Sequence, residues 1–155
     1  MRAVNTARTF SLGNETEQRI TEYLTSKGSV VQKVDHKTYP YDLLVTDKNG
    51  NAFAFEVKTF GAPNTTKLFT ETVQISKVNK IQTIPEYLEH SEEIDYITWY
   101  NRLTGCAYFF DCKIFTAYVL ANKHKERLNS YGTGKGILIE CECKEAGFLY
   151  KREGV

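Results

Sequence analysis

The stretch from Pro40 to Lys58 reads PYDLLVTDKNGNAFAFEVK, and it predicts the centre of the fold. Two runs rich in apolar residues, Tyr41–Val45 and Ala52–Thr59, flank a segment of turn-forming residues, which is the pattern of a β-hairpin. Because side chains alternate along a strand, Glu56 and Lys58 are expected on one face and the large apolar residues on the other. The face with the two charges also carries two alanines, which leaves room for a ligand.

The length of the hairpin loop decides whether Asp42 lies beside Glu56. A two-residue loop at Asn49-Gly50 would pair Asp42 with the residue after Glu56, on the wrong face. A three-residue loop with Gly50 in the left-handed conformation sets Asp42 opposite Glu56, and Asp47 suits the type I turn and G1 bulge of such a loop. We expect the three-residue loop, with the Cβ atoms of the two acids about 5 Å apart.

Two adjacent carboxylates and a lysine have two explanations. The acids repel each other unless a cation lies between them, and Mg²⁺ prefers such hard oxygen ligands. A metal there generates hydroxide and neutralises charge on a scissile phosphate, while Lys58 positions or helps deprotonate the attacking water. The other explanation is an exposed Asp–Glu–Lys network on a solvated strand face, and the spacing alone favours it.

The rest of the chain predicts helices and strands around this hairpin. A polar arm over residues 1–12 precedes a helix that opens at Asn14, where Glu17 completes a capping box, and that ends at Gly28. The further expected elements are strands at Val30–Val34, Ile94–Tyr100, Cys106–Asp111 and Ile137–Cys143, and helices over residues 73–89 and 113–128. The order α-β-β-β-α-β-β-α-β predicts an α/β architecture with a mixed central sheet flanked by helices.

Length and composition bound the class of protein. A chain of 155 residues with 41% hydrophobic residues fits one globular domain. It has no apolar run of about 20 residues and no apolar segment near its start, so we expect an intracellular, cytoplasmic protein without a membrane span. The net charge of +1 gives no general case for nucleic-acid binding, so such binding must rest on a local site. The four cysteines lack zinc-ribbon spacing, and we interpret them as buried thiols.

Two motifs resemble a known family. Asp42 followed by Glu56-x-Lys58 is similar to the signature of the PD-(D/E)XK nucleases, although Tyr41 separates Pro40 from Asp42. Upstream, residues 13–20 read GNETEQRI and resemble the Gly-x-x-x-Glu-Arg-x-Leu opening of helix one in archaeal-type Holliday junction resolvases. The resemblance covers roughly residues 13–111, with residues 112–155 as an extension of a single domain. It implies a restriction-endonuclease-like fold.

The resemblance also implies an activity. It implies a Mg²⁺-dependent phosphodiesterase, with Mn²⁺ as a substitute, in which Asp42, Glu56 and the Val57 carbonyl bind the metal. Glu17 assists at the metal and Lys58 serves the nucleophile. For Glu17 the alternative is a role in capping the helix alone.

Several side chains are candidates for contact with nucleic-acid phosphates. Lys33, Lys37 and Lys67 flank the expected site, and His36 lies close to it in the sequence. Gln74 and Lys77 lie at the start of the predicted helix over residues 73–89, where a solvated helix face is the alternative. The basic run at residues 123–127 has a second explanation, because cations stabilise the end of a helix.

These observations favour an endonuclease that acts on DNA. Its small size suits a structure-selective, resolvase-like enzyme or a restriction-like enzyme. Both are expected to work as homodimers, because two cuts need two sites. The small size also suits a phage or mobile-element origin. An RNA-directed nuclease of the same superfamily is one alternative, and a non-catalytic binding or assembly subunit with the nuclease fold is another. The sequence has no Walker A loop, GxGxxG or GxSxG motif, which sets aside nucleotide-driven motors, dehydrogenases and serine hydrolases.

Overall fold

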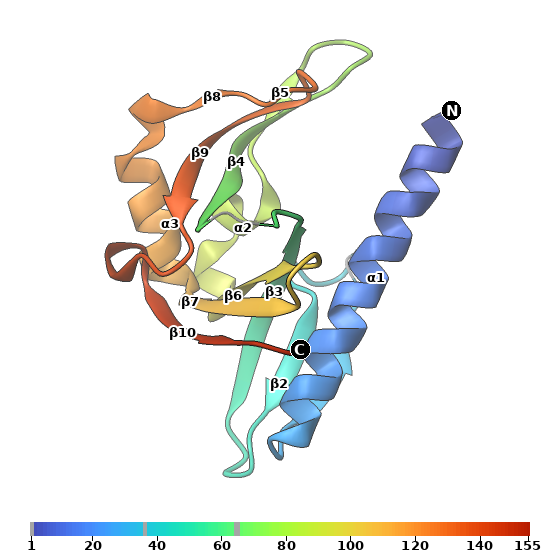
Figure 1. Cartoon of the computed structure of the whole chain (residues 1–155), viewed down its shortest axis with the longest axis vertical. Coiled ribbons are helices and arrows are strands. Elements are labelled where there is room, and N and C mark those ends of the chain that lie inside the picture. Colours follow the sequence, from blue (N-terminus) through green and yellow to red (C-terminus); the bar gives the residue numbers. More distant parts are fainter. Residues whose placement is uncertain (1, 36, 64–65) are drawn as a thin grey trace.

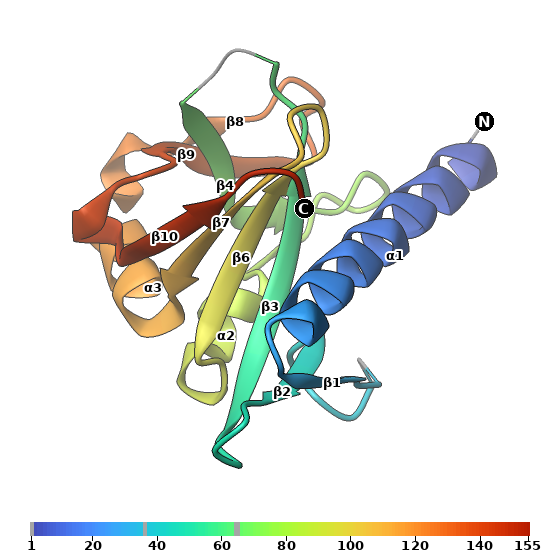
Figure 2. The same ribbon diagram turned by 60° about the horizontal axis from the view of Figure 1, so that its bottom comes forward.

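The chain is built on a six-stranded sheet in the order β1-β2-β3-β6-β7-β10 (Figures 1 and 2). The computed structural model describes residues 2–35, 37–63 and 66–155. The strands of this sheet are β1 (Val30–Lys33), β2 (Leu43–Thr46), β3 (Ala52–Phe60), β6 (Tyr96–Asn101), β7 (Cys106–Asp111) and β10 (Phe148–Arg152). β3 and β6 pair in parallel and the other neighbours pair antiparallel, so the sheet is mixed, as expected.

A second, antiparallel sheet lies over one face of the first, with the order β5-β4-β9-β8 (Figure 1). Its strands are β4 (Lys67–Ile75), β5 (Gln82–Thr83), β8 (Arg127–Leu128) and β9 (Gly134–Glu140). The helices are α1 (Arg2–Ser26), α2 (Glu86–Glu89) and α3 (Cys112–Ala121), with 3-10 turns at Ser91–Glu93, Lys123–Lys125 and Lys144–Ala146. α1 crosses the other face of the six-stranded sheet, and its N-terminal half extends beyond that sheet (Figure 2).

The β2–β3 hairpin has the predicted three-residue loop. Leu43 pairs with Phe55, and Asp47 donates its N–H to the carbonyl of Asn51, which leaves residues 48–50 as the loop. Gly50 has a φ of 86°, a left-handed conformation that glycine adopts without strain. The Asp47 carboxylate closes the turn by accepting hydrogen bonds from the N–H groups of Asn49 and Asn51, both at 2.9 Å.

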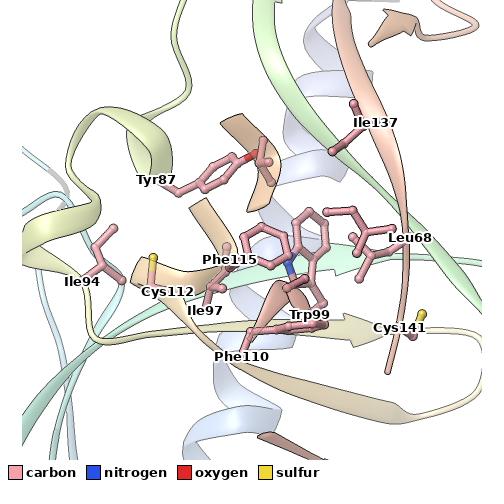
Figure 3. Close-up of a cluster of buried hydrophobic side chains, with 13 residues drawn as sticks. Leu68, Tyr87, Ile94, Ile97, Trp99, Phe110, Cys112, Phe115, Ile137 and Cys141 are labelled. Atoms are coloured by element: carbon pink, nitrogen blue, oxygen red, sulfur yellow. The ribbon is translucent and has the colours of Figure 1, made fainter. Parts of the chain in front are cut away.

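The central strands are covered on both faces. On the α1 side, Ile20 and Leu24 pack against apolar residues of the sheet such as Leu43, Phe55 and Phe109. On the other side, α2, α3 and the second sheet enclose a larger cluster (Figure 3). In that cluster the rings of Tyr87, Trp99 and Phe115 lie about 6 Å apart, with centroid distances of 6.1 and 6.2 Å. The face expected to be open is therefore mostly core.

The helix predicted over residues 73–89 is wrong. β4 continues through Ile75, β5 follows, and only Glu86–Glu89 is helical. Leu68, Thr70 and Thr72 are buried at every second position, and β4 finds its main partner in β9, far along the chain. Pro85 lies immediately before α2, where its missing N–H costs no intrahelical hydrogen bond.

Three other boundaries differ from those expected. α1 already begins at Arg2, so the segment over residues 2–12 is helical and Asn14 is not an N-cap, although the helix does end before Gly28. α3 stops at Ala121, and Arg127 belongs to β8 instead of a longer helix. The strand expected at Ile137–Cys143 spans Gly134–Glu140, and β10 follows as an additional strand that pairs with β7.

Tyr87 connects α2 to the second sheet, which leads to a stability prediction. Its hydroxyl hydrogen-bonds to Thr70 Oγ1 at 2.6 Å and to the carbonyl of Glu71, both on β4. Tyr87→Phe keeps the buried ring and removes these bonds, so we expect unfolding free energy to fall by about 1–2 kcal/mol. Urea unfolding at neutral pH measures the change, with the exposed Tyr131→Phe as the matched control. An unchanged midpoint would show that this link contributes nothing.

Candidate active site

Asp42 and Glu56 form a buried acid pair. The register of the hairpin continues from Leu43 and Phe55 to place them opposite each other, and each side chain is only 5% exposed. The N–H of Val57 donates to Asp42 Oδ2 at 2.7 Å, which ties Asp42 to the backbone beside Glu56. The predicted adjacency is therefore confirmed, and the solvated-network explanation is wrong because neither acid faces solvent.

The electrostatics of the pair centre on Glu56. Burial, together with a hydrogen bond to Asp42, raises the pKa of the Glu56 carboxyl from 4.5 to about 9, and the positive charge of Lys58 offsets part of this rise. Because two facing carboxylates repel each other, the pair holds a proton at neutral pH when no metal ion lies between them.

Lys58 reaches from the same face of β3 into a cavity of about 180 Å³ at the border of the two sheets. Its Nζ lies 5.7 Å from the centre of the Tyr87 ring, a favourable position for a cation over an aromatic face. Glu71 and Gln74 of β4 line the same cavity. Lys58 thus acts on the buried Glu56 through its charge and also lines a cavity whose walls are partly polar and partly apolar.

Glu71 is a site residue that the sequence analysis missed. Burial raises the pKa of its carboxyl, and the charge of Lys58 opposes that rise, which places the two side chains in each other's field. No local motif marks Glu71, because it reaches Lys58 through the pairing of the second sheet. The available signal was the alternation of Glu71 with Thr70 and Thr72, which is the pattern of a strand rather than of a helix.

Glu17 lies on α1 and is half-buried. Its neighbour Thr16 accepts a hydrogen bond from Thr59 at 2.7 Å, and Gly13, one turn earlier, lines a cavity together with Val57 and Lys58. The capping role is wrong because the helix begins twelve residues before Asn14. The role of Glu17 at a metal stays a prediction.

The candidate phosphate contacts are spread over the molecule. Gln74 lines the Lys58 cavity from the end of β4 instead of from a helix, and Lys77 is exposed in the turn beyond it. Lys67 begins β4. Lys33, on the edge strand β1, pairs with Leu43 and points to the same face of the sheet as Leu43, which is the face opposite to that of Asp42. Lys37 is exposed in the turn after β1. His36 lies outside the described residues.

The thiols and the residues of other metal sites do not add to this site. Cys106, Cys112 and Cys141 are buried and Cys143 is half-buried, close to the expectation. Over residues 2–35, 37–63 and 66–155, no three His, Cys, Asp or Glu side chains gather into a metal-binding group.

Comparison with known proteins identifies the fold. No protein family and no curated protein matches the sequence. Within the described part of the chain, no helix has both the length and the apolar character needed to cross a membrane. Among solved structures, the chain is similar to a bacterial homing endonuclease, I-Ssp6803I, with a TM-score of 0.55 and 16% identity over 82% of this chain and 74% of the other. The chain therefore has an endonuclease-like α/β fold.

Proposed function

We propose that this protein is a Mg²⁺-dependent endonuclease that hydrolyses phosphodiester bonds of DNA. The observation that carries the proposal is the buried pair Asp42–Glu56, followed on the same strand by Lys58, which lines a cavity with Glu71 and Gln74. Burying two acids side by side costs stability, and such arrangements are concentrated at functional sites, where the charges take part in binding or catalysis. The likeness to a homing endonuclease supports the nuclease class.

The acid pair fits a hard divalent cation. Two carboxylates and the adjacent Val57 carbonyl offer oxygen ligands, and Mg²⁺ commonly takes one or two protein carboxylates and fills its remaining positions with water and substrate oxygens. In the proposal Asp42, Glu56 and Val57 hold the metal, Glu17 assists, and Mn²⁺ substitutes. A bound cation supplies positive charge at the scissile phosphate and favours ionisation of a water molecule.

The protein's own groups position the reaction around that site. The N–H of Val57 fixes the Asp42 carboxylate at 2.7 Å, so one ligand is held before substrate arrives. Lys58, with its ammonium group above the Tyr87 ring, directs a positive charge into the cavity. There it stabilises the charge that develops on the phosphate and orients the attacking water.

The test is cleavage of labelled branched, duplex and single-stranded DNA, and of RNA, with Mg²⁺ or with EDTA. Asp42→Asn is the sharpest variant, because its side-chain oxygen still accepts the hydrogen bond from Val57 while its charge is lost. We expect Mg²⁺-dependent cleavage by the wild type and none by Asp42→Asn. Lys48→Ala, in the exposed loop at the far end of the hairpin, should cleave normally.

The same panel separates the alternatives. Preference for a branched substrate would support a resolvase-like enzyme, preference for duplex a restriction-like one, and preference for RNA an RNA-directed nuclease. Cutting of both strands together with a dimeric mass in solution would support the homodimer. A wild type that binds nucleic acid but cuts no substrate, with Mg²⁺ or Mn²⁺, would support a non-catalytic subunit and contradict our proposal.

A further inference from the structure

Lys58 lies where two cavities meet. The cavity of about 180 Å³ extends toward the second sheet, and another of about 480 Å³ extends toward α1; Lys58 and Thr59 line both. Arg102, in the turn between β6 and β7, lines the α1-side cavity with Gly61. A substrate strand passing Lys58 can therefore continue toward Arg102.

The side chain of Arg102 rests on Gly61. A Cβ atom built on Gly61 would lie 3.0 Å from Arg102 Nε and 3.1 Å from Cζ, closer than ordinary van der Waals contact. The backbone of Gly61 does not have a positive φ, so its conformation does not require glycine. Because Gly61 has no side chain, the guanidinium of Arg102 can pack directly on its backbone.

The backbone around Arg102 is fixed to the end of β3. Arg102 donates its N–H to the carbonyl of Phe60 at 2.9 Å. The side chain of Asn101, which is 1% exposed, accepts from the Ala62 N–H at 3.2 Å and donates to the Ala62 carbonyl at 2.7 Å. These bonds hold the turn and the segment after β3 together, so the base of Arg102 is held in place relative to Lys58.

No carboxylate neutralises Arg102 in the ion pairs of the described residues. Glu15 lines another cavity together with Arg102, but it pairs with Arg19 at 3.6 Å. Arg102 is exposed and lines an open cavity, and a guanidinium there without an acid partner is suited to bind a phosphate through paired N–H groups. The three residue steps from Lys58 to Gly61, which directly follows β3, span about 10 Å, and this equals about three nucleotides of rise in B-form DNA.

We infer that Arg102 binds a backbone phosphate of the cleaved strand, within about three nucleotides of the scissile phosphate. This inference rests on the proposed function and adds a substrate-positioning residue to it. Arg102 sets the direction in which the strand leaves Lys58, toward α1.

The test measures binding of the best-cleaved DNA by fluorescence anisotropy in EDTA, over a series of NaCl concentrations. We expect Arg102→Ala to weaken binding about tenfold and to reduce the slope of log K against log salt by about one, the value for one lost phosphate contact. Arg102→Lys should keep the slope and lose part of the affinity. Lys48→Ala removes one charge outside the cavities and should change neither.

Gly61→Val supplies a second, independent variant. It removes no charge, but its side chain displaces the guanidinium, so we expect a loss of affinity similar to that of Arg102→Ala. The double variant should bind no more weakly than either single variant, because both remove the same contact. Circular dichroism melts of all variants check that the fold is kept.

The outcomes separate the inference from the proposed function. If Arg102→Ala binds as Lys48→Ala does while Asp42→Asn abolishes cleavage, Arg102 does not bind phosphate and the nuclease proposal stands. Additive losses in the double variant would also contradict the inference. If the wild type neither binds nor cleaves any substrate, the proposed function fails, and the inference with it.

Discussion

Replacing Lys58 with methionine is expected to lower the rate of the chemical step about 1000-fold, the effect of losing one positioned charge from a reaction site. Methionine keeps most of the apolar stem that crosses the cavity, so the change removes chiefly the ammonium group. Single-turnover cleavage with saturating enzyme measures the rate apart from binding. DNA affinity should fall far less, because Arg102 and the rest of the interface still bind the DNA.

Two further variants make this prediction specific. Lys58→Arg keeps a positive charge but spreads it over a larger planar group, and we expect it to recover only a small part of the activity. Lys48→Ala should match the wild type. If Lys58→Met retains more than about a tenth of the wild-type rate, the ammonium group does not act in the chemical step.

Replacing Glu56 with glutamine is expected to stabilise the metal-free protein at alkaline pH. The pKa of Glu56 is raised from 4.5 to about 9 in the folded protein, so between these values the folded protein holds a proton that the unfolded chain has released. Stability therefore falls as pH rises, by about 1.4 kcal/mol for each pH unit and about 4 kcal/mol between pH 5 and pH 8. Glutamine has no proton to lose, so this part of the pH dependence should disappear.

Urea unfolding at pH 5 and pH 8, with EDTA, measures the effect. The exposed Glu92→Gln is the matched control and should keep the wild-type slope. Adding Mg²⁺ at pH 8 should raise the melting temperature of the wild type but not of Glu56→Gln, since a ligand that binds only the folded state stabilises it. A wild type equally stable at both pH values would contradict the environment described for Glu56.

The hairpin and its acid pair could be predicted because local chemistry determines them. Asp47 and Gly50 select the three-residue loop, and the loop then sets the register of Asp42 against Glu56. Two residues along the same strand, Lys58 follows from alternation alone. These parts of the site needed no information from distant segments.

The second sheet could not be predicted in this way. The apolar residues after Val73 have a spacing that a helix also allows, and β4 is a strand because β9 pairs with it from far along the chain. Glu71 and Arg102 share this limitation. Each reaches the neighbourhood of Lys58 only through tertiary contacts. Glu71 does so through the pairing of β4, and Arg102 through the hydrogen bonds between Asn101 and Ala62.

The pairing of β4 with β9 also bears on the order of folding. The β2–β3 hairpin closes a short loop, whereas β4 and β9 meet only after β6, β7 and α3, which lie between them in the sequence, have been accommodated. Closing a long loop costs more entropy, and contacts between distant segments form more slowly. We therefore expect a newly synthesised chain to form its acid pair early, and the second sheet, whose strand β4 carries Glu71 and Gln74, late. We expect the cavity around Lys58 to be completed only when β9 pairs with β4, so an immature chain would carry the acids without the enclosure around them.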